Sequence, residues 1–206
     1  MTIKEIFKFM RDEIHTVVAA TVDENGLPEA RVIDVMLYDE GGLYFITAKG
    51  KRFYESLAAK GYMAVSGYKG ADTMSSIAVS VSGRVKEVGT ELVDRVFEEN
   101  KYMSQIYPTK ASRQALTVFK LFSGRAEYFD LSKKPIERYS LAFGEEAQYE
   151  HGYFVTEKCI GCGECLKLCP QNCIELKDGI AKIKQNNCLH CGNCVSACAV
   201  GAVERR

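Results

Sequence analysis

The spacing of the cysteines constrains this chain more than any other feature of its sequence. All nine lie between Cys159 and Cys198, and the first 158 residues contain none. Within that segment the sequence repeats with an offset of 29 residues, so that the run from Cys159 to Cys169 matches the run from Cys188 to Cys198. Each run reads C-x2-C-x2-C-x3-C. Thiols placed this densely in a short repeat indicate a fold built around whatever the sulfurs bind.

The two runs resemble those of bacterial two-cluster ferredoxins, in which the fourth cysteine of each run ligates the other cluster. Three thiolates three residues apart let a tight loop hold three corners of an iron–sulfur cube, and Gly163 and Gly192 permit the turn. We expect the start of a short helix after each loop to supply the fourth ligand to the neighbouring cube. The sequence therefore predicts one-electron transfer by two 4Fe-4S clusters, with cluster 1 held by Cys159, Cys162, Cys165 and Cys198 and cluster 2 by Cys188, Cys191, Cys194 and Cys169.

Zinc is the competing metal. Zinc ribbons typically use two C-x2-C pairs with a longer spacer, whereas three cysteines crowd each loop here, which favours iron–sulfur. Cys173 falls on Ala202 in the repeat, a small core position, and is predicted to be a buried thiol rather than a ninth ligand. His190 stands where the first run has Gly161 and is predicted to be a loop or surface residue rather than a ligand.

The change in cysteine content also predicts a domain boundary. At 206 residues the chain has room for one ordinary domain and a small one. We place the boundary after the polar stretch 144–150, which gives domains 1–150 and 151–206.

Charge and hydropathy limit the kinds of partner and the cellular location that we expect for this protein. Lys plus Arg and Asp plus Glu number 27 each, so net charge gives no argument for nucleic acid or a membrane surface, and we expect neither as a partner. No apolar run approaches the roughly 18 residues of a membrane helix. The first turns carry charged residues and no signal sequence, so we expect a cytoplasmic protein, where disulfides are rare.

The first domain carries a helical pattern followed by strand signals. The apolar residues Ile3, Ile6, Phe7, Met10 and Ile14 share one face of a helix predicted over 1–14. Asn-Gly at 25–26 predicts a hairpin tip. Further helices are expected over 52–60 and 91–100, and strands over 16–22, 31–38, 43–47, 63–68, 77–88 and 118–131. Many short strands with few helices predict a mainly β domain shaped as a small barrel.

Other sites have little support from sequence motifs. The chain has no phosphate loop and no G-x-G-x-x-G motif. His15 adjoins an apolar strand and is expected to be a packed core or surface histidine.

The order of these elements resembles the flavin-binding split barrel of the pyridoxamine 5'-phosphate oxidase-like family. The matching stretches are 26–33, 43–52, 79–85 and 125–130. The resemblance implies a mainly β fold with α, a split β-barrel flavin-binding domain followed by the small α+β dicluster ferredoxin domain. It also implies FMN as cofactor and a homodimer with the flavin at the subunit interface.

By position, the resemblance assigns flavin contacts to eight residues of this chain. Backbone and side chains of Arg31, Val32, Ile33 and Asp34 are expected to line the isoalloxazine and ribityl chain, with Ile46 and Thr47 also touching the cofactor. Lys51 and Arg52 are expected to neutralise the phosphate, for which an arginine fork is well suited. The alternative for Lys51 and Arg52 is an ordinary solvated helix start.

Two departures from the family argue against a vitamin-B6 substrate. Phe53 stands where the oxidase has a lysine, and Ala78 stands where it has a glutamine. Both changes weaken the expected grip on a pyridoxamine 5'-phosphate substrate.

The two cofactors together predict a function. A flavin takes two electrons and releases them singly, whereas a cluster handles one. We therefore expect an iron–sulfur flavoprotein oxidoreductase that passes single electrons between two 4Fe-4S clusters and FMN, reduces a small substrate, and meets a redox partner such as ferredoxin or a reductase. Two alternatives stay open, an electron carrier without its own substrate and a redox or oxygen sensor. No acid–base pair stands out in the sequence, which keeps the carrier open, and a deazaflavin could replace FMN.

Overall fold

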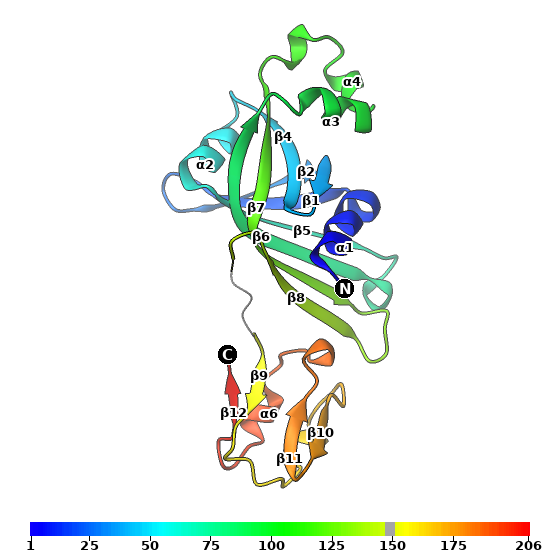
Figure 1. Ribbon diagram of the computed structural model, residues 1–206, viewed down its shortest axis with the longest axis vertical. Helices are drawn as coiled ribbons and strands as arrows, with labels where there is room; N and C mark the ends of the chain where they lie inside the picture. Colours follow the sequence, from blue (N-terminus) through cyan, green and yellow to red (C-terminus); the bar gives the residue numbers. More distant parts are fainter. Residues whose placement is uncertain (147–150) are drawn as a thin grey trace. The chain divides into compact units, whose positions relative to one another are not determined.

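A computed structural model of the protein describes residues 1–146 and 151–206 (Figure 1). The chain divides into two compact units. The first contains Met1–Lys69, Ala78–Glu127 and residues 141–146, and the second contains Gly70–Ile77, Tyr128–Ser140 and residues 151–206. The predicted boundary at residue 150 lies outside the described residues, and the division 1–150 and 151–206 stays a prediction.

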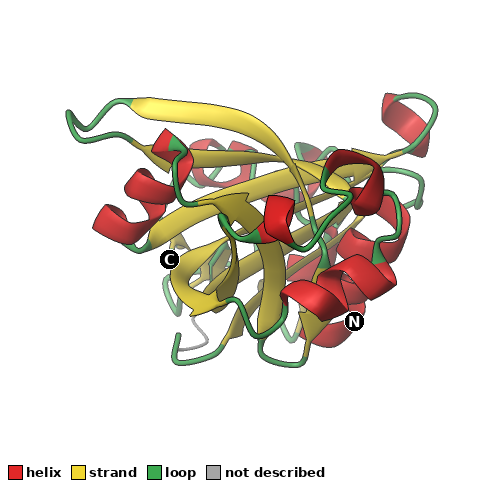
Figure 2. Cartoon of the chain, turned by 90° about the horizontal axis from the view of Figure 1, so that it is seen from above, coloured by secondary structure: helices red, strands yellow, loops and turns green. Residues whose placement is uncertain are grey.

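An antiparallel sheet dominates the first 146 residues. Its strands occur in the order β2-β1-β5-β6-β7-β4-β3, with β8 paired to β7. They are β1 (Thr16–Val22), β2 (Pro28–Asp34), β3 (Leu37–Asp39), β4 (Gly42–Ala48), β5 (Tyr62–Lys69), β6 (Ile77–Gly89), β7 (Leu116–Asp130) and β8 (Glu137–Phe143). Figure 2 shows the long strands crossing in curved layers with helices at the margins. The mainly β fold class is confirmed.

Helices lie between and before these strands. They are α1 (Ile3–Phe9), the π-helix η1 (Met10–Ile14), α2 (Arg52–Lys60), the 3-10 turns η2 (Thr73–Ser75) and η3 (Ala111–Arg113), α3 (Val93–Glu99) and α4 (Met103–Ile106). The predicted helices over 52–60 and 91–100 are confirmed as α2 and α3. Strand β8 and helix α4 were not predicted.

The first helix begins at a capping box, in which Glu5 N–H donates to Thr2 Oγ1 and Thr2 N–H donates to Glu5. Ile6, Phe7 and Met10 are fully buried, which confirms the predicted apolar face, and each such side chain contributes about 1.5–3 kcal/mol of burial. The helix ends as a π-helix and not as a regular α-turn. His15 then reverses the chain with φ of 62°, a strained value for a non-glycine residue.

The strand predicted over 31–38 is wrong in its extent, because it is two strands. Hydrogen bonding changes partner at Val35 and Met36: Val35 N–H donates to His15 O, and Met36 N–H donates to Tyr44 O. The chain thus leaves β1 and joins β4, where Leu37 lies opposite Tyr44. The apolar run continues through the crossover, so the sequence pattern does not reveal the break.

The C-terminal segment is small and repeats its own structure. It contains β9 (Tyr153–Val155), α5 (Glu164–Lys167), β10 (Ile174–Lys177), β11 (Ile180–Ile183), the 3-10 turn η4 (Gln185–Asn187), α6 (Asn193–Ser196) and β12 (Val203–Arg205). β9 pairs with β12 and β10 with β11. Its core consists of Cys173, Ile174, Ala181, Cys188, Cys194 and Val203, so half of the buried core residues are cysteines. This is the predicted small α+β domain.

Candidate cofactor sites

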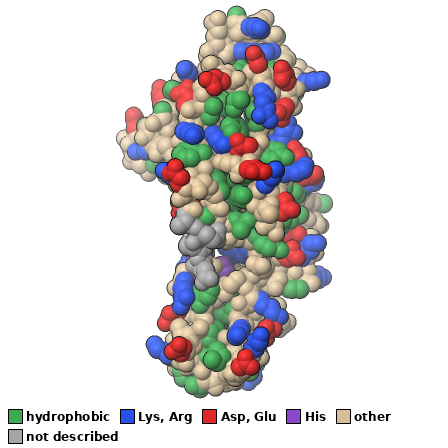
Figure 3. Space-filling model, in the orientation of Figure 1, with side chains coloured by type: hydrophobic (Ala, Val, Ile, Leu, Met, Phe, Trp, Pro, Cys, Tyr) green, Lys and Arg blue, Asp and Glu red, His purple; other side chains and the backbone are tan. Residues whose placement is uncertain are grey.

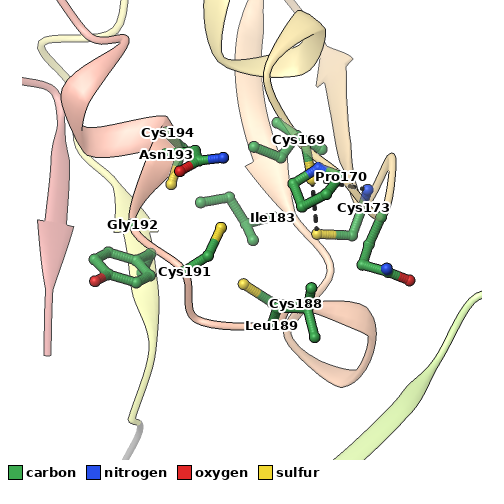
Figure 4. A pocket seen from close by; sticks show the side chains of 13 residues that line it. Cys169, Pro170, Cys173, Ile183, Cys188, Leu189, Cys191, Gly192, Asn193 and Cys194 are labelled. Carbon is green, nitrogen blue, oxygen red and sulfur yellow. Dashed lines mark hydrogen bonds between the residues drawn. The ribbon is translucent and has the colours of Figure 1, made fainter. Parts of the chain in front are cut away.

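The eight cysteines predicted as ligands separate into two sets of four around two cavities. One cavity is lined by Cys169, Cys188, Cys191 and Cys194, whose side chains surround a common space in Figure 4. The other is lined by Cys159, Cys162, Cys165 and Cys198. Each cavity takes three cysteines from one run and the fourth from the other, which is the crossed arrangement that the resemblance to two-cluster ferredoxins implies.

The fourth cysteine of each run arrives by a different route from the one we expected. Cys169 and Cys198 lie beyond the ends of α5 and α6, not at the starts of these helices. Each helix instead begins directly after the glycine that lies two residues before the third cysteine of its run. These glycines, Gly163 and Gly192, are in the left-handed conformation, with φ of 76° and 83° respectively. Glycine permits this turn, as expected, and the helix then carries the chain away to the other cavity.

Backbone amides point at the sulfurs of both cavities. Cys173 N–H donates to Cys169 Sγ at 3.4 Å, and Ala202 N–H donates to Cys198 Sγ at 3.1 Å, at equivalent positions of the repeat. His190 N–H donates to Cys188 Sγ at 3.4 Å, and Ala181 N–H donates to Cys159 Sγ at 3.5 Å. Such bonds stabilise the thiolate form that a metal ligand requires.

Protonation of these thiols depends on burial. Burial raises the pKa of Cys165, and the neighbouring thiolates of Cys159, Cys162 and Cys198 raise it further. Burial likewise raises the pKa of Cys194. For Cys169, burial acts against the thiolate, but hydrogen bonds from Cys173 and from backbone amides outweigh it and lower the pKa. Four mutually repelling thiolates need positive charge in the space between them, which iron would supply.

The donor set therefore fits an iron–sulfur cube. Among the described residues, no three His, Cys, Asp or Glu side chains are arranged for a single metal ion. The four thiols of each set instead line the walls of a cavity, with amides directed at them. These cysteines would hold a cluster that supplies one-electron transfer.

Cys173 and His190 lie beside the cavity that Cys169 shares with Cys188, Cys191 and Cys194. Cys173 is 3% exposed, and its Sγ is 3.4 Å from Cys169 Sγ. Burial raises the pKa of Cys173 well above its usual range. This matches the predicted buried thiol, although the thiol also lines the cavity. His190 occupies a left-handed position with φ of 56°, where the first run has Gly161 with φ of 68°, and its ring contacts Tyr153 and His151.

A third cavity, of about 500 Å³, lies in the first unit. This volume is within the roughly 300–1,000 Å³ typical of small-molecule sites. All eight residues predicted as flavin contacts line it: Arg31, Val32, Ile33, Asp34, Ile46, Thr47, Lys51 and Arg52. The first four come from β2, the next two from β4, and the last two from the start of α2. β2 and β4 stand near opposite ends of the strand order, so the curl of the sheet brings them together.

One wall of this cavity holds a partly satisfied arginine. Arg31 donates to Glu29 at 2.7 Å, and its guanidinium lies 4.4 Å from the centre of the Phe53 ring. Its Nε is buried and has no hydrogen-bond partner within the part of the chain that the structure describes. An orphaned donor at the cavity wall fits an acceptor on a bound group. The ring of Phe53 supports Arg31, which gives a structural role to the residue that departs from the family.

The basic end of the cavity lies at the start of α2. Lys51 is the N-cap residue and Arg52 the first helical residue, and both side chains are exposed at the cavity. Arg52 is 3.7 Å from Glu29. Helix N–H groups and two cations make this end suitable for a phosphate. Lys51 and Arg52 thus begin a solvated helix and also line the cavity, and their contact with a phosphate stays a prediction.

Phe53, singled out above as a departure from the family, also lines the cavity, together with six residues that the sequence did not single out: Met36, Ala48, Met103, Ile106, Tyr107 and Leu116. Met103, Ile106 and Tyr107 come from α4 and its end, an element that was not predicted. Ala48 and Leu116 are cross-strand partners and could have been found from strand pairing alone.

Within the described residues, no helix combines the length and apolar character needed to cross a membrane. On the face seen in Figure 3, basic and acidic side chains are interspersed. This agrees with the equal totals of the two charges.

Comparison with known proteins gives two family matches in the order that the sequence suggests. Residues 3–130 match the family model described as pyridoxamine 5'-phosphate oxidase, and residues 158–202 match a 4Fe-4S dicluster domain. Among curated proteins, the pyridoxine/pyridoxamine 5'-phosphate oxidase of Burkholderia ambifaria is 32% identical over 136 residues, or 66% of this chain. The chain spans 60% of the length of that relative.

Solved structures show the same fold at low sequence identity. A NimC/NimA family protein from Clostridium acetobutylicum has a TM-score of 0.54 at 16% identity, over 67% of this chain and 92% of that chain. A conserved hypothetical protein from Mycobacterium tuberculosis has a TM-score of 0.54 at 17% identity, over 71% of this chain and 95% of that chain. The predicted split barrel is confirmed by these matches.

Proposed function

Because the chain belongs to the pyridoxamine 5'-phosphate oxidase family over residues 3–130 and carries a 4Fe-4S dicluster domain over 158–202, we propose that it is an iron–sulfur flavoprotein that passes single electrons between two 4Fe-4S clusters and FMN. It uses these electrons to reduce a small substrate. A bound flavin exchanges two electrons with a substrate and single electrons with a cluster.

One observation carries the proposal. The residues predicted to hold each cofactor, chosen from sequence alone, line three separate cavities in three complete groups. A scattered arrangement of either the thiols or the eight flavin contacts would have removed its support.

Residues of the third cavity have distinct tasks in holding FMN. Lys51, Arg52 and the α2 amides would neutralise its phosphate. Arg31, fixed by Glu29 and Phe53, would donate its free Nε–H to an acceptor on the cofactor. Thr47 is 4% exposed and lines the cavity, where its hydroxyl would meet the ribityl chain or the ring.

The substrate is not pyridoxamine 5'-phosphate in this proposal. Phe53 packs under Arg31 in place of the family's lysine. Ala78 in β6 has no side-chain amide, whereas the oxidase has a glutamine at this position. A small, unsaturated or oxidised organic molecule beside the flavin suits the space that remains.

Anaerobic purification tests the cofactor content. Iron and sulfide analysis should give about eight of each per chain, and mass spectrometry should identify FMN rather than a deazaflavin. Zinc, or about four irons or fewer, would refute the two-cluster proposal. Rapid-mixing spectroscopy with reduced ferredoxin should then show cluster reduction followed by flavin reduction. Flavin that stays oxidised beside reduced clusters would refute electron transfer between them.

We also propose a homodimer, supported by an apolar strip on the sheet. Val18 and Val32 are cross-strand partners and are 49% and 67% exposed. Val32 also lines the flavin cavity, so a second copy on this strip would help to enclose the cofactor. Light scattering should give twice the chain mass, and Val32→Arg should give monomers that bind FMN weakly. Leu176→Arg, at a 44% exposed position of β10, is the matched control and should stay dimeric.

A further inference from the structure

A chain of three polar side chains connects the flavin cavity to the protein surface. Asp34 lines the cavity. Tyr102 Oη donates to Asp34 Oδ2 at 2.5 Å, and His15 Nε2 lies 3.0 Å from the same Tyr102 Oη. Thr16 Oγ1 donates to the other carboxylate oxygen at 2.8 Å. Because the phenol proton is directed at Asp34, the tyrosine oxygen accepts from His15, which must carry a proton on Nε2.

Backbone structure holds His15 at the outer end of this chain. The π-helix η1 ends at His15, whose N–H donates to Met10 O at 2.8 Å, while its carbonyl accepts from Val35 N–H at 2.8 Å. Its φ of 62° is a strained value for a non-glycine residue. The imidazole is 31% exposed and therefore meets water. A π-helix and a strained residue are features that often accompany functional sites.

We propose that His15, Tyr102 and Asp34 form a proton relay that serves a substrate reduced in the flavin cavity. Asp34 is the proton donor at the cavity wall, and Tyr102 and His15 are the residues that resupply it. The inference rests on the proposed function, and it adds the acid–base group that the sequence did not reveal. A pure electron carrier has no need of such a relay.

The step balances as follows. A bound reduced flavin would supply the substrate with a hydride and its two electrons, and Asp34 would supply the proton. The proton of Tyr102 Oη moves to Asp34 as the Nε2 proton of a His15 imidazolium moves to Tyr102. His15 is left as the neutral Nδ1–H tautomer, and water returns the Nε2 proton. In substrate oxidation every transfer runs in reverse.

Charged side chains near the relay come from two elements, η1 and α3. Arg11 on η1 lies close enough to act electrostatically on Tyr102, and it contacts Glu99 on α3 at 3.6 Å. Met36 Sδ is 3.7 Å from Tyr102 Oη. Burial and the hydrogen bond to Asp34 raise the pKa of Tyr102 well above its usual range, so the phenol keeps its proton at rest. Tyr102 can then pass a proton on only when His15 supplies another.

Two electron acceptors test the relay in the reduced, full-length protein. Menadione takes up two electrons and two protons, whereas ferricyanide takes one electron and no proton. In rapid mixing at the flavin absorption band, Asp34→Asn, Tyr102→Phe and His15→Gln should each slow reoxidation by menadione about 100-fold, which is typical for loss of a general acid. Ferricyanide should reoxidise Tyr102→Phe and His15→Gln, whose altered side chains do not line the cavity, at the wild-type rate.

Tyr54→Phe is the matched control. Tyr54 Oη also donates to a carboxylate, Glu87, at 3.0 Å, but neither residue lines the flavin cavity. It should leave both rates unchanged. Menadione rates that stay at the wild-type value in Tyr102→Phe would overturn the relay, and an equal loss with both acceptors would also overturn it, because that result indicates damage to the flavin site.

A second measurement needs no flavin. The chain has three histidines, so the ring nitrogens of His15 can be assigned by nuclear magnetic resonance. Neutral His15 should be the Nε2–H tautomer, and Tyr102→Phe should shift its Nε2 resonance. Unchanged His15 resonances would overturn the hydrogen-bond chain itself. Protein that binds no flavin but shows this shift would refute the proposed function and confirm the chain of hydrogen bonds, which separates the two failures.

Discussion

Replacing cysteines in pairs tests which thiols share a cluster. Cys159 and Cys198 line one cavity although they are 39 positions apart and belong to different runs, whereas Cys188 and Cys198 belong to one run and line different cavities. With two cubes, the chain holds about eight irons, and loss of one ligand set removes about four. Cys159→Ala and Cys198→Ala should therefore each lose about four irons.

The double variants distinguish crossed ligand sets from sets in which each run holds its own cluster. Cys159→Ala with Cys198→Ala removes two ligands of the same cube, so the loss should remain about four irons. Cys188→Ala with Cys198→Ala damages both cubes, so the loss should reach about eight. Iron and sulfide analysis of anaerobic protein, together with electron paramagnetic resonance of the reduced form, measures the outcome. The reverse pattern, with about eight lost from the first pair and about four from the second, would show that each run holds its own cluster.

Four further results are expected. Removal of iron by a chelator should increase hydrogen exchange across 151–206 and leave the sheet core protected, because cysteines make half of the small core; unchanged exchange there would contradict this. Cys173→Ala should keep about eight irons, and a loss of about four would make Cys173 a ligand. Arg52→Ala should weaken FMN binding about 10-fold by calorimetry, while Lys60→Ala, at the far end of α2, should not; equal affinities would remove Arg52 from the phosphate site. Burial opposes ionisation of Asp39, but Lys120 and Tyr44 donate to it at 2.8 Å and 2.6 Å and lower its pKa. The stabilisation that ionised Asp39 gives the fold is therefore complete above about pH 4 and is lost as the pH falls through the lowered pKa. Asp39→Asn should reduce the fall of the free energy of unfolding in acid by up to about 1 kcal/mol. This figure is small because Asp39 is 46% exposed. Identical acid limbs in chemical unfolding would contradict it.

Local spacing determined the parts of this protein that depend on a few neighbouring residues. Three cysteines and a glycine within seven positions specify a loop around a cube, and the copy 29 residues later specifies a second one. The resemblance to two-cluster ferredoxins implies the exchange of fourth ligands, and the thiols group around the two cavities in this crossed way. The helix over 52–60 also matches α2 to the residue, because its start is polar and Gly61 ends it in the left-handed conformation with φ of 60°. The eight flavin positions were located by resemblance to a family, and the fold brings them together.

Tertiary structure alone decided the features that join distant segments. The break between β2 and β3 follows from hydrogen bonds to His15 and Tyr44, and the apolar pattern of 31–38 has no sign of it. Helix α4 reaches the cavity wall through residues that resemble ordinary core positions in the sequence. The relay combines residues 15, 34 and 102, which have no common motif and meet because sheet curvature and a π-helix bring three separate segments to one point. The sequence determines the chemistry of each side chain, whereas the partner that a side chain meets across a curved sheet depends on how the whole chain packs.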